Sequence, residues 1–333
     1  PNHSLCGHTE IGFSKDWNNW RSQALKVEDG SCIIRYKAHP TENYLALASN
    51  KGKIYVLDST FKILLETEAI DYSIKILKLQ FIKDELFFLY EDLDKGIILD
   101  SYNYKSSKEN FSKKLDIEDK LIPPYKFDFD LNHKNLVYSD FEGCKLIGLE
   151  NGKVESTRRT NSVNGPMVFD SKRNGVFIFD AYKSNRSLIF IQLDFLNINK
   201  NLFYPKVEFP YDNISFNKKG ELVLDFVDVK IFGNDFLKPN YFRIPESDYN
   251  LVGVNYQSTI YDKSSELFFS VEGNSISQFD VDTLFIRSYD QFGKKKDYFS
   301  LKVKKNEFNS FQFFAAYLNE PKLIVLKDNE FQL

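Results

Sequence analysis

The chain has few of the residues with which enzymes perform nucleophilic or metal-assisted chemistry. Its 333 residues include 4 His, 3 Cys and 1 Met. The sequence contains no G-x-S-x-G nucleophile motif, no P-loop, no dinucleotide-binding glycine pattern and no calcium-loop motif. Cys6, Cys32 and Cys144 are widely spaced and odd in number, which argues against a disulfide framework and favours a reducing compartment. We therefore expect a cytoplasmic protein without a cofactor.

A strong charge imbalance and long apolar runs are also absent. The chain carries 47 acidic and 44 basic side chains, a net charge of −3, so no global field commits it to nucleic acid or acidic lipid. No apolar run reaches the about 18 residues of a membrane-spanning helix. Residues 1–14 lack the basic and apolar regions of a signal peptide. These absences leave a folded protein whose binding patches are local.

Aromatic residues are abundant, and the apolar residues recur at a regular interval. The chain has 32 Phe and 19 Tyr. Seven segments share an aromatic or apolar residue, a polar turn, an apolar run, a second turn and a second apolar run. The first apolar runs of these segments begin at Tyr44, Leu86, Leu136, Val176, Leu222, Leu267 and Leu323. The mean interval of 46.5 residues makes seven such units nearly as long as the chain.

These apolar runs are typical of strands rather than helices. They are short, rich in Phe, Ile, Val, Leu and Tyr, and bounded by Gly, Asn, Asp and Ser. Four strands in each unit of about 40 to 50 residues indicate a blade of a β-propeller. The sequence therefore predicts an all-β, seven-bladed propeller of four-stranded antiparallel blades.

The repeats resemble those of the WD40-like β-propeller superfamily from about Arg21 to Leu333. The sequence departs from the WD40 pattern, because no Gly-His dipeptide marks the blade boundaries and no Trp-Asp pair occurs. An acidic residue does recur after the third expected strand, and we interpret it as a turn-forming carboxylate. These residues are Asp58, Asp100, Asp194 and Asp280, with Asp235 less regular. The resemblance implies a rigid scaffold whose loops bind other proteins.

The two ends of the chain are expected to close the ring together. The last repeat stops at Leu333 in its third expected strand, and Arg21–Glu28 is a spare strand-like segment that would complete that blade. Residues 1–20 would form an extension with a short helix over Gly12–Arg21, and residues 21–333 the propeller.

That expected helix carries the first candidate for partner binding. Phe13, Trp17 and Trp20 are spaced at i, i+4 and i+7, and Ser14 is suited to cap the helix. The aromatic face would either pack against the propeller or anchor a partner, because tryptophan is enriched in interface hot spots.

The second candidate is a basic stretch near the end of the chain. Lys294, Lys295 and Lys296 precede three further lysines and two aromatic residues, in a loop expected between the sixth and seventh blades. Such a stretch is either a solvated loop or a contact for an acidic protein or nucleic acid. We predict that it forms an electrostatic rim of the partner site.

Other chemistry-bearing residues have plainer interpretations. His3, Cys6 and His8 could ligate zinc or copper, but no second pair of ligands accompanies them. His39 and His133 lie in equivalent turns of two repeats. The acidic clusters would suit a glycosidase only if two carboxylates converged, and otherwise are solvated turn residues. These clusters are Asp128–Asp130, Asp225–Asp228 and Glu91–Asp94.

Three functions remain open from the sequence. The first is a non-enzymatic protein-binding propeller, such as a bacterial immunity protein that neutralises a secreted toxin. The second is a carbohydrate-active enzyme or small-ligand binder with acidic residues at the channel. The third is a scaffold subunit of a larger assembly. The lack of a catalytic motif favours protein binding.

Overall fold

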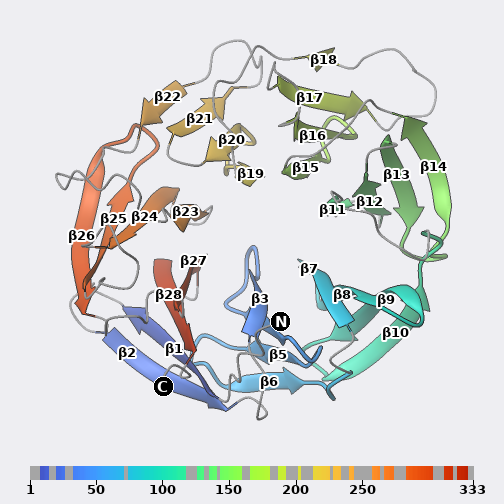
Figure 1. Cartoon of the computed structure of the whole chain (residues 1–333), viewed down its shortest axis with the longest axis horizontal. Helices are drawn as coiled ribbons and strands as arrows, with labels where there is room; N and C mark the ends of the chain where they lie inside the picture. Colours follow the sequence, from blue (N-terminus) through green and yellow to red (C-terminus); the bar gives the residue numbers. More distant parts are fainter. Residues whose placement is uncertain are drawn as a thin grey trace.

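The fold is seen in a computed structural model of the whole chain. The structure describes residues 8–14, 20–26, 33–70, 74–117, 126–130, 135–140, 143–159, 166–180, 187–192, 202–203, 213–225, 228–233, 240–243, 257–262, 266–273, 283–302, 311–317 and 321–328. Within these ranges, 28 strands form seven four-stranded antiparallel sheets, which stand around a ring (Figure 1). The prediction of an all-β propeller with four-stranded antiparallel blades is confirmed.

Each sheet runs from an inner strand near the ring centre to an outer strand at the rim (Figure 1). Sheet 1 consists of β3 (Ile33–Ala38), β4 (Leu45–Ser49), β5 (Ile54–Leu57) and β6 (Ile63–Glu66). Sheet 2 consists of β7 (Ile74–Ile82), β8 (Glu85–Asp92), β9 (Gly96–Asn103) and β10 (Lys108–Lys114). Sheet 3 consists of β11 (Lys126–Asp130), β12 (Asn135–Ser139), β13 (Gly143–Gly148) and β14 (Val154–Arg159).

The next three sheets repeat this order. Sheet 4 consists of β15 (Met167–Asp170), β16 (Gly175–Asp180), β17 (Ser187–Gln192) and β18 (Leu202–Phe203). Sheet 5 consists of β19 (Asn213–Phe216), β20 (Leu222–Asp225), β21 (Asp228–Phe232) and β22 (Asn240–Arg243). Sheet 6 consists of β23 (Gln257–Asp262), β24 (Leu267–Gly273), β25 (Thr283–Tyr289) and β26 (Lys295–Lys302).

The apolar runs found in the sequence form the second strand of each sheet. They correspond to β4, β8, β12, β16, β20, β24 and β28 (Pro321–Asp328). All five residues of β4 are buried, because sheets pack against both of its faces. This two-sided burial explains why these runs are continuously apolar instead of alternating.

The core is divided among the contacts between neighbouring sheets. One cluster joins Ala46 and Ile54 of sheet 1 to Phe88 of sheet 2. Four further clusters join sheets 2 and 3, 3 and 4, 4 and 5, and 5 and 6 in the same way. Sheets 2 to 5 therefore each bury apolar side chains against both neighbours, and the stability of one sheet depends on the next.

Short turns with a side-chain acceptor connect several neighbouring strands. In the β5–β6 turn, Asp58 Oδ1 accepts the backbone N–H of Thr60 at 2.8 Å and of Lys62 at 3.0 Å. The fourth residue of this turn, Phe61, has a positive φ of 63°. In the β4–β5 turn that position is Gly52 with φ 76°, and a Cβ there would lie 2.3 Å from Ile74 Cδ1. Glycine is therefore required where this turn packs against the next sheet.

Both ends of the chain contribute to sheet 7. Its order is β2-β1-β28-β27, in which β1 (His8–Ser14) and β2 (Trp20–Lys26) are joined to β28 and β27 (Phe311–Tyr317). Thr9 is paired with Asp328, and Phe13 with Ile324. The predicted closure by an N-terminal strand is confirmed for the Arg21–Lys26 part of β2. A second N-terminal strand takes the third position, whereas residues 329–333, expected there, lie outside the described part.

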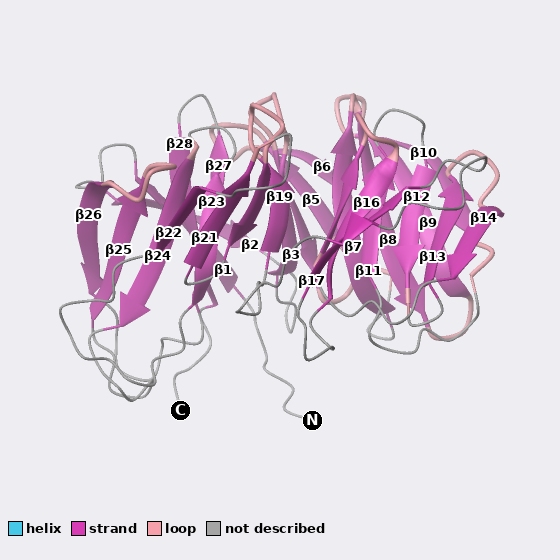
Figure 2. Ribbon diagram, turned by 90° about the horizontal axis from the view of Figure 1, so that it is seen from above, coloured by secondary structure: helices cyan, strands magenta, loops and turns pink. Residues whose placement is uncertain are grey.

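The predicted helix over Gly12–Arg21 is wrong. Figure 2 shows strands and loops but no helix in the described part of the chain. β1 lies before the boundary expected at residue 21, and it is hydrogen-bonded on both sides, to β2 and to β28. Three aromatic residues at helical spacing are a short signal, and two complete ladders of backbone hydrogen bonds outweigh it. The alternation of Thr9, Ile11 and Phe13 with polar residues or glycine also indicates a strand.

Because β1 and β2 complete sheet 7, we expect deletion of the N-terminal segment to lower the stability of the protein strongly. Deletion of residues 1–26 removes two of the four strands of sheet 7 and leaves β28 as an open edge. We expect a fall in melting temperature of at least about 5 °C, or aggregation on expression. Thermal unfolding followed by circular dichroism measures the change.

The matched control moves the deleted segment instead of removing it. Residues 1–26, attached through a flexible linker after Leu333, can pair again with β28, so this permuted chain should recover most of the lost stability. A truncated chain that melts with the full-length protein would show that closure does not hold the ring together.

Candidate functional site

The three lysines predicted to bind a partner lie in sheet 6. Lys294 is in the β25–β26 turn, and Lys295 and Lys296 begin the outer strand β26. The expected loop between the sixth and seventh blades is therefore wrong for these residues, because β26 pairs with β25 from Tyr289↔Lys295 onward. All three lysines are exposed to solvent.

The turn that carries these lysines has a defined backbone. Asp290 Oδ1 accepts the backbone N–H of Phe292 and of Lys294, each at 2.9 Å, and Gly293 has a φ of 76°. Asp290 Oδ2 lies 3.1 Å from Lys296 Nζ. Partial burial opposes ionisation of Asp290, but the Lys294 and Phe292 N–H groups and the Lys296 ammonium outweigh it and lower the pKa of the carboxyl. The hairpin is held by its own side-chain acceptor.

Phe292 is the residue of this hairpin that the sequence reasoning missed. Its side chain is 73% exposed at the tip of the turn. The D-x-x-G pattern of Asp290 to Gly293 is a turn signal in the sequence. It places Phe292 between the aspartate that accepts backbone N–H groups and the glycine with a positive φ. An exposed aromatic ring beside three exposed lysines combines the residue types of an interface anchor and its cationic rim.

The aromatic residues of the N-terminal segment are not brought together on a helix. Phe13 lies in β1 and Trp20 begins β2, where they belong to neighbouring strands. Trp17 lies outside the described residues, as do His3, Cys6, Cys32 and His133. The role of Phe13, Trp17 and Trp20 in partner binding stays a prediction.

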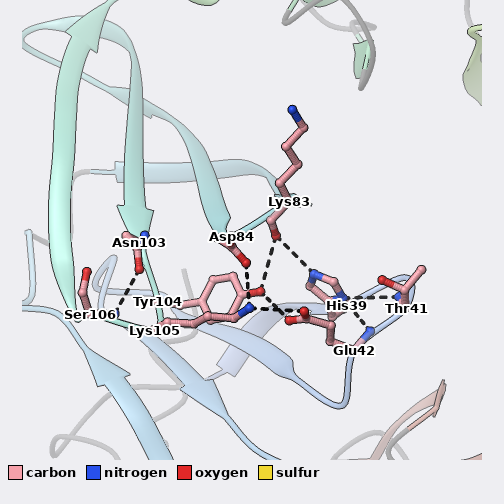
Figure 3. A network of polar contacts seen from close by, with 9 residues as sticks. All are labelled: His39, Thr41, Glu42, Lys83, Asp84, Asn103, Tyr104, Lys105 and Ser106. Carbon is pink, nitrogen blue, oxygen red and sulfur yellow. Dashed lines mark hydrogen bonds and ion pairs between the residues drawn. The ribbon is translucent and has the colours of Figure 1, made fainter.

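His39 is a structural residue of the contact between sheets 1 and 2 (Figure 3). The side chain is buried and its ring lies 4.9 Å from the Phe81 ring, centroid to centroid. Nδ1 accepts the backbone N–H of Glu42 at 2.8 Å and of Thr41 at 3.3 Å. Nε2 is then the protonated nitrogen, and it lies 3.3 Å from the Lys83 carbonyl oxygen. With both nitrogens engaged, the ring has no lone pair available for a substrate.

A polar network continues from His39 to the β9–β10 turn (Figure 3). The Tyr104 hydroxyl donates to Glu42 Oε2 at 2.9 Å. Lys105 Nζ lies 3.2 Å from Glu42 Oε1 and 2.7 Å from Asp84 Oδ1. Burial raises the pKa of Tyr104, and the Glu42 carboxylate raises it further. The network therefore joins three turns of two sheets.

Asp128, one of the acidic residues considered for glycoside chemistry, is bound within the wall of the ring. Lys78 of β7 donates to Asp128 Oδ1 of β11, and to the Phe127 carbonyl oxygen at 2.8 Å. Asp128 Oδ2 accepts the backbone N–H of Phe169 of β15 at 2.7 Å. The carboxylate thus links the inner strands of three sheets. This structural role accounts for an aspartate at this position, and no catalytic role is needed to explain it.

Asp100 departs from the turn role expected for it. Asp58 caps a turn as predicted, but Asp100 lies inside β9 and is 4% exposed. Burial raises the pKa of Asp100, and the charge of Glu109 raises it further, against hydrogen bonds from Ser112, Tyr90 and Tyr102. Oδ1 has no hydrogen-bond partner within the described part. Asp194, Asp235 and Asp280 lie outside the described residues.

Two further kinds of site were considered, a groove between two sheets and a metal site. A groove between sheets 2 and 3 is lined by Lys114, Asp116, Lys145 and Lys153. Among the described residues, no three His, Cys, Asp or Glu side chains are grouped as metal ligands. No described helix is long and apolar enough to cross a bilayer.

The fold is similar to that of several solved structures, among them a WD40 domain. No protein-family model and no curated protein matches the sequence. The C-terminal WD40 domain of Sif2 is similar with a TM-score of 0.57 and 8% identity, over 97% of this chain and 90% of that chain. Hsv2 of Kluyveromyces lactis has a TM-score of 0.57 and 13% identity, over 86% of each chain. Raptor of Chaetomium thermophilum has a TM-score of 0.59 and 11% identity, over 90% of this chain and 28% of that chain.

These likenesses confirm the resemblance expected from the repeats. The chain has a β-propeller fold, and this fold is similar to that of the WD40 domain of Sif2. Identities of 8% to 13% carry the fold and no particular activity.

The His39 contacts predict a loss of stability on substitution. His39→Ala removes the acceptor of two backbone N–H groups and leaves a void beside Phe81. We expect the free energy of unfolding to fall by about 2 to 3 kcal/mol. Tyr104→Phe removes one hydroxyl and should cost about 1 kcal/mol. Urea unfolding measures both, and an unchanged midpoint for His39→Ala would contradict the structural role.

The raised pKa of Asp100 predicts a gain of stability on neutralisation. Its folded-state pKa lies above the ordinary 3.8, so the free energy of unfolding falls as the pH rises through that folded-state pKa. Asp100→Asn removes this penalty and should stabilise the protein at about pH 7 by about 1 kcal/mol. The gain should shrink as the pH approaches about 4. Urea unfolding at both pH values measures it.

Asp92→Asn is the matched control, with the opposite sign. Asp92 Oδ1 accepts the backbone N–H of Asp94 and of Lys95, each at 2.9 Å. Partial burial opposes ionisation, but these N–H groups outweigh it and lower the pKa of Asp92. Its carboxylate stabilises the fold above the unfolded-state pKa, and this contribution is lost as the pH falls through the folded-state pKa. Asp92→Asn should therefore destabilise the protein at about pH 7.

Proposed function

We propose that the protein is a non-enzymatic scaffold that binds another protein through the β25–β26 hairpin. The observation that carries this proposal is Phe292, whose ring is 73% exposed on a turn fixed by Asp290. A large aromatic side chain in water has an unfavourable contact with solvent, and a partner pocket relieves it. Because the turn is already ordered, little conformational entropy is lost on binding.

The three lysines beside Phe292 give the hairpin a cationic rim. Lys294, Lys295 and Lys296 are exposed, so their charges act mainly on the encounter with an acidic partner and less on the final affinity. Hydrophobic anchor and charged rim are the usual anatomy of a protein interface. The fold of the structural neighbours supports a scaffold role of this kind.

The test compares partner capture by hairpin variants. Full-length protein, Phe292→Ala and the triple variant Lys294→Glu, Lys295→Glu, Lys296→Glu are immobilised and exposed to lysate of the native organism. We expect a stoichiometric partner with the parent chain, at least about tenfold weaker retention with Phe292→Ala, and slower association with the triple variant. Quantitative mass spectrometry and biolayer interferometry with the purified partner measure these changes.

Leu93→Ala is the matched control, because this apolar side chain is also exposed, at 75%, but lies in the β8–β9 turn of another sheet. It should retain the partner fully. Full retention by Phe292→Ala would exclude the hairpin as the anchor of the interface.

A narrower proposal concerns the identity of the partner. We propose a secreted toxin that the chain neutralises as an immunity protein in the cytoplasm. The support is the divergence of the repeats and their unequal intervals, which suit a scaffold adapted to one particular partner. Coexpression with the product of a neighbouring gene tests it, with survival of the host cell expected only when this chain is present.

A further inference from the structure

The groove between sheets 2 and 3 has the size of a small-molecule site. Its volume is about 790 Å³, which lies within the range of pockets that hold small ligands. One wall is the end of β10 together with residues 115–117, which follow it. The other wall is formed by β13, β14 and the turn between them. Two sheets therefore contribute to this site, and neither of them carries the β25–β26 hairpin.

Backbone contacts fix the two walls of the groove against each other. The Asp116 N–H donates to the Gly152 carbonyl oxygen at 2.8 Å. A Cβ atom on Gly152 would lie 3.0 Å from the Lys114 carbonyl oxygen, so the β13–β14 turn and the end of β10 are in close contact. Lys113 Nζ donates a further hydrogen bond to the Leu149 carbonyl oxygen at 3.3 Å. The groove is therefore formed before a ligand binds, and little conformational entropy is lost on binding.

A β-bulge turns the side chain of Thr157 toward the groove. Val154 of β14 is paired with Ile147 of β13. Thr157 is paired with Lys145, and the register shifts between the two pairs. Lys145 and Ile147 are two residues apart and share one face of the sheet, and so do their partners. Val154 and Thr157, three residues apart, would face opposite sides in a regular strand, but the bulge brings both to the lining of the groove.

Two lysines enter the groove from its two walls. Lys114 ends β10 and Lys153 precedes β14, and both residues are exposed. Both adjoin Gly152, because Lys153 follows it in the chain and the Lys114 carbonyl oxygen is in close contact with it. The contact between the walls thus brings the two lysines to the same part of the groove. Each ammonium has three N–H donors and attracts phosphate as a point charge.

Carboxylates limit the positive charge of the groove. Asp116 is part of the lining. Lys145, the third lysine of the lining, is 15% exposed, and its Nζ lies 3.9 Å from Asp140 Oδ2, so we assign its charge to that carboxylate. Two lysines and one aspartate then face a ligand. This balance suits a single phosphate monoester, with a charge of about −2 and three acceptor oxygens, because a second phosphate would be repelled by Asp116.

The other polar groups of the lining suit hydroxyl groups of a ligand. Asp116 accepts hydrogen bonds, and the Thr157 hydroxyl both donates and accepts them. Asn151 Oδ1 accepts the Lys153 backbone N–H at 2.8 Å, so its NH₂ group is the part that donates to a ligand. None of the described lining residues is aromatic, so the groove has no ring on which a nucleobase would stack. A molecule with several hydroxyl groups and one phosphate therefore fits the lining better than a nucleotide.

We propose that this groove binds a phosphorylated polyol, such as a sugar phosphate, with the phosphate between Lys114 and Lys153. The hydroxyl groups of the ligand contact Asp116, Asn151 and Thr157. This site goes beyond the proposed protein-binding function, because it lies in sheets 2 and 3 whereas the hairpin lies in sheet 6.

The test measures binding of glucose 6-phosphate, ribose 5-phosphate and glycerol 3-phosphate to the full-length chain by isothermal titration calorimetry. We expect at least one of them to bind with a dissociation constant below about 1 mM. Glucose, glycerol and inorganic phosphate should each bind at least about tenfold more weakly, because each makes only part of the contacts. The groove variant, Lys114→Gln with Lys153→Gln, should weaken binding of the sugar phosphate at least about tenfold.

The matched control carries Lys108→Gln and Lys126→Gln, one exposed lysine from each of the same two sheets but outside the groove lining. It removes the same charge and should change the affinity less than about twofold. Thermal unfolding of each variant verifies that the fold is retained. If the groove variant does not fold, Thr157→Val gives the comparison, because it keeps the shape of the side chain, removes the hydroxyl and should weaken binding about threefold or more.

The proposal is overturned if none of the three phosphates binds, or if the groove variant and the control lose affinity equally. Equal affinity for inorganic phosphate also overturns it and assigns the groove to a plain anion. Binding to phosphatidylglycerol vesicles without binding of the free compounds overturns it as well, because the phosphorylated polyol then belongs to a lipid. Phe292→Ala should leave the affinity for the sugar phosphate unchanged, so the failure of partner capture through the hairpin and the failure of this inference are distinguishable.

Discussion

The pairing of β1 with β28 is the contact on which the ring depends. It joins residues near opposite ends of the chain, Phe13 to Ile324 and Thr9 to Asp328. Sheets 2 to 5 each bury apolar side chains against two neighbours, so the loss of one sheet would expose apolar faces on both sides of it. The backbone hydrogen bonds between β1 and β28 keep the ring closed. A closed ring in turn holds neighbouring sheets together, so that the Phe, Ile and Leu clusters between them stay buried.

Within the closed ring, polar side chains have two distinct structural roles. Some fix the chain locally, as Asp58 and Asp290 do by accepting backbone N–H groups of their own turns. Others connect sheets, as His39 and Asp128 do across neighbouring inner strands and turns. His39 and Asp128, two of the candidates for chemistry, are thus engaged in the fold. We propose that the exposed Phe292 of the β25–β26 hairpin serves recognition of another protein.

Much of the fold was predictable because it is repeated. Seven apolar runs, each flanked by turn residues, located the second strand of every sheet, since burial on both faces demands continuous apolar sequence. The site was less predictable. Lys294, Lys295 and Lys296 stood out as a run, but Phe292 was one aromatic residue among 32 Phe, and only the turn geometry distinguishes it.

The sequence by itself determined the repeat interval and the second strand of each sheet, because these follow from local burial and backbone preference. The tertiary structure decided the secondary structure of residues 8–14 and 20–26, where pairing of β1 with β28 and β2 overrides the helical spacing of Phe13 and Trp20. It also decided the role of each charged side chain. Asp100 is buried in a strand while Asp58 caps a turn, although both follow an apolar run. Position in the ring sets solvent access, and solvent access sets whether a charge stabilises the fold or is available to a partner.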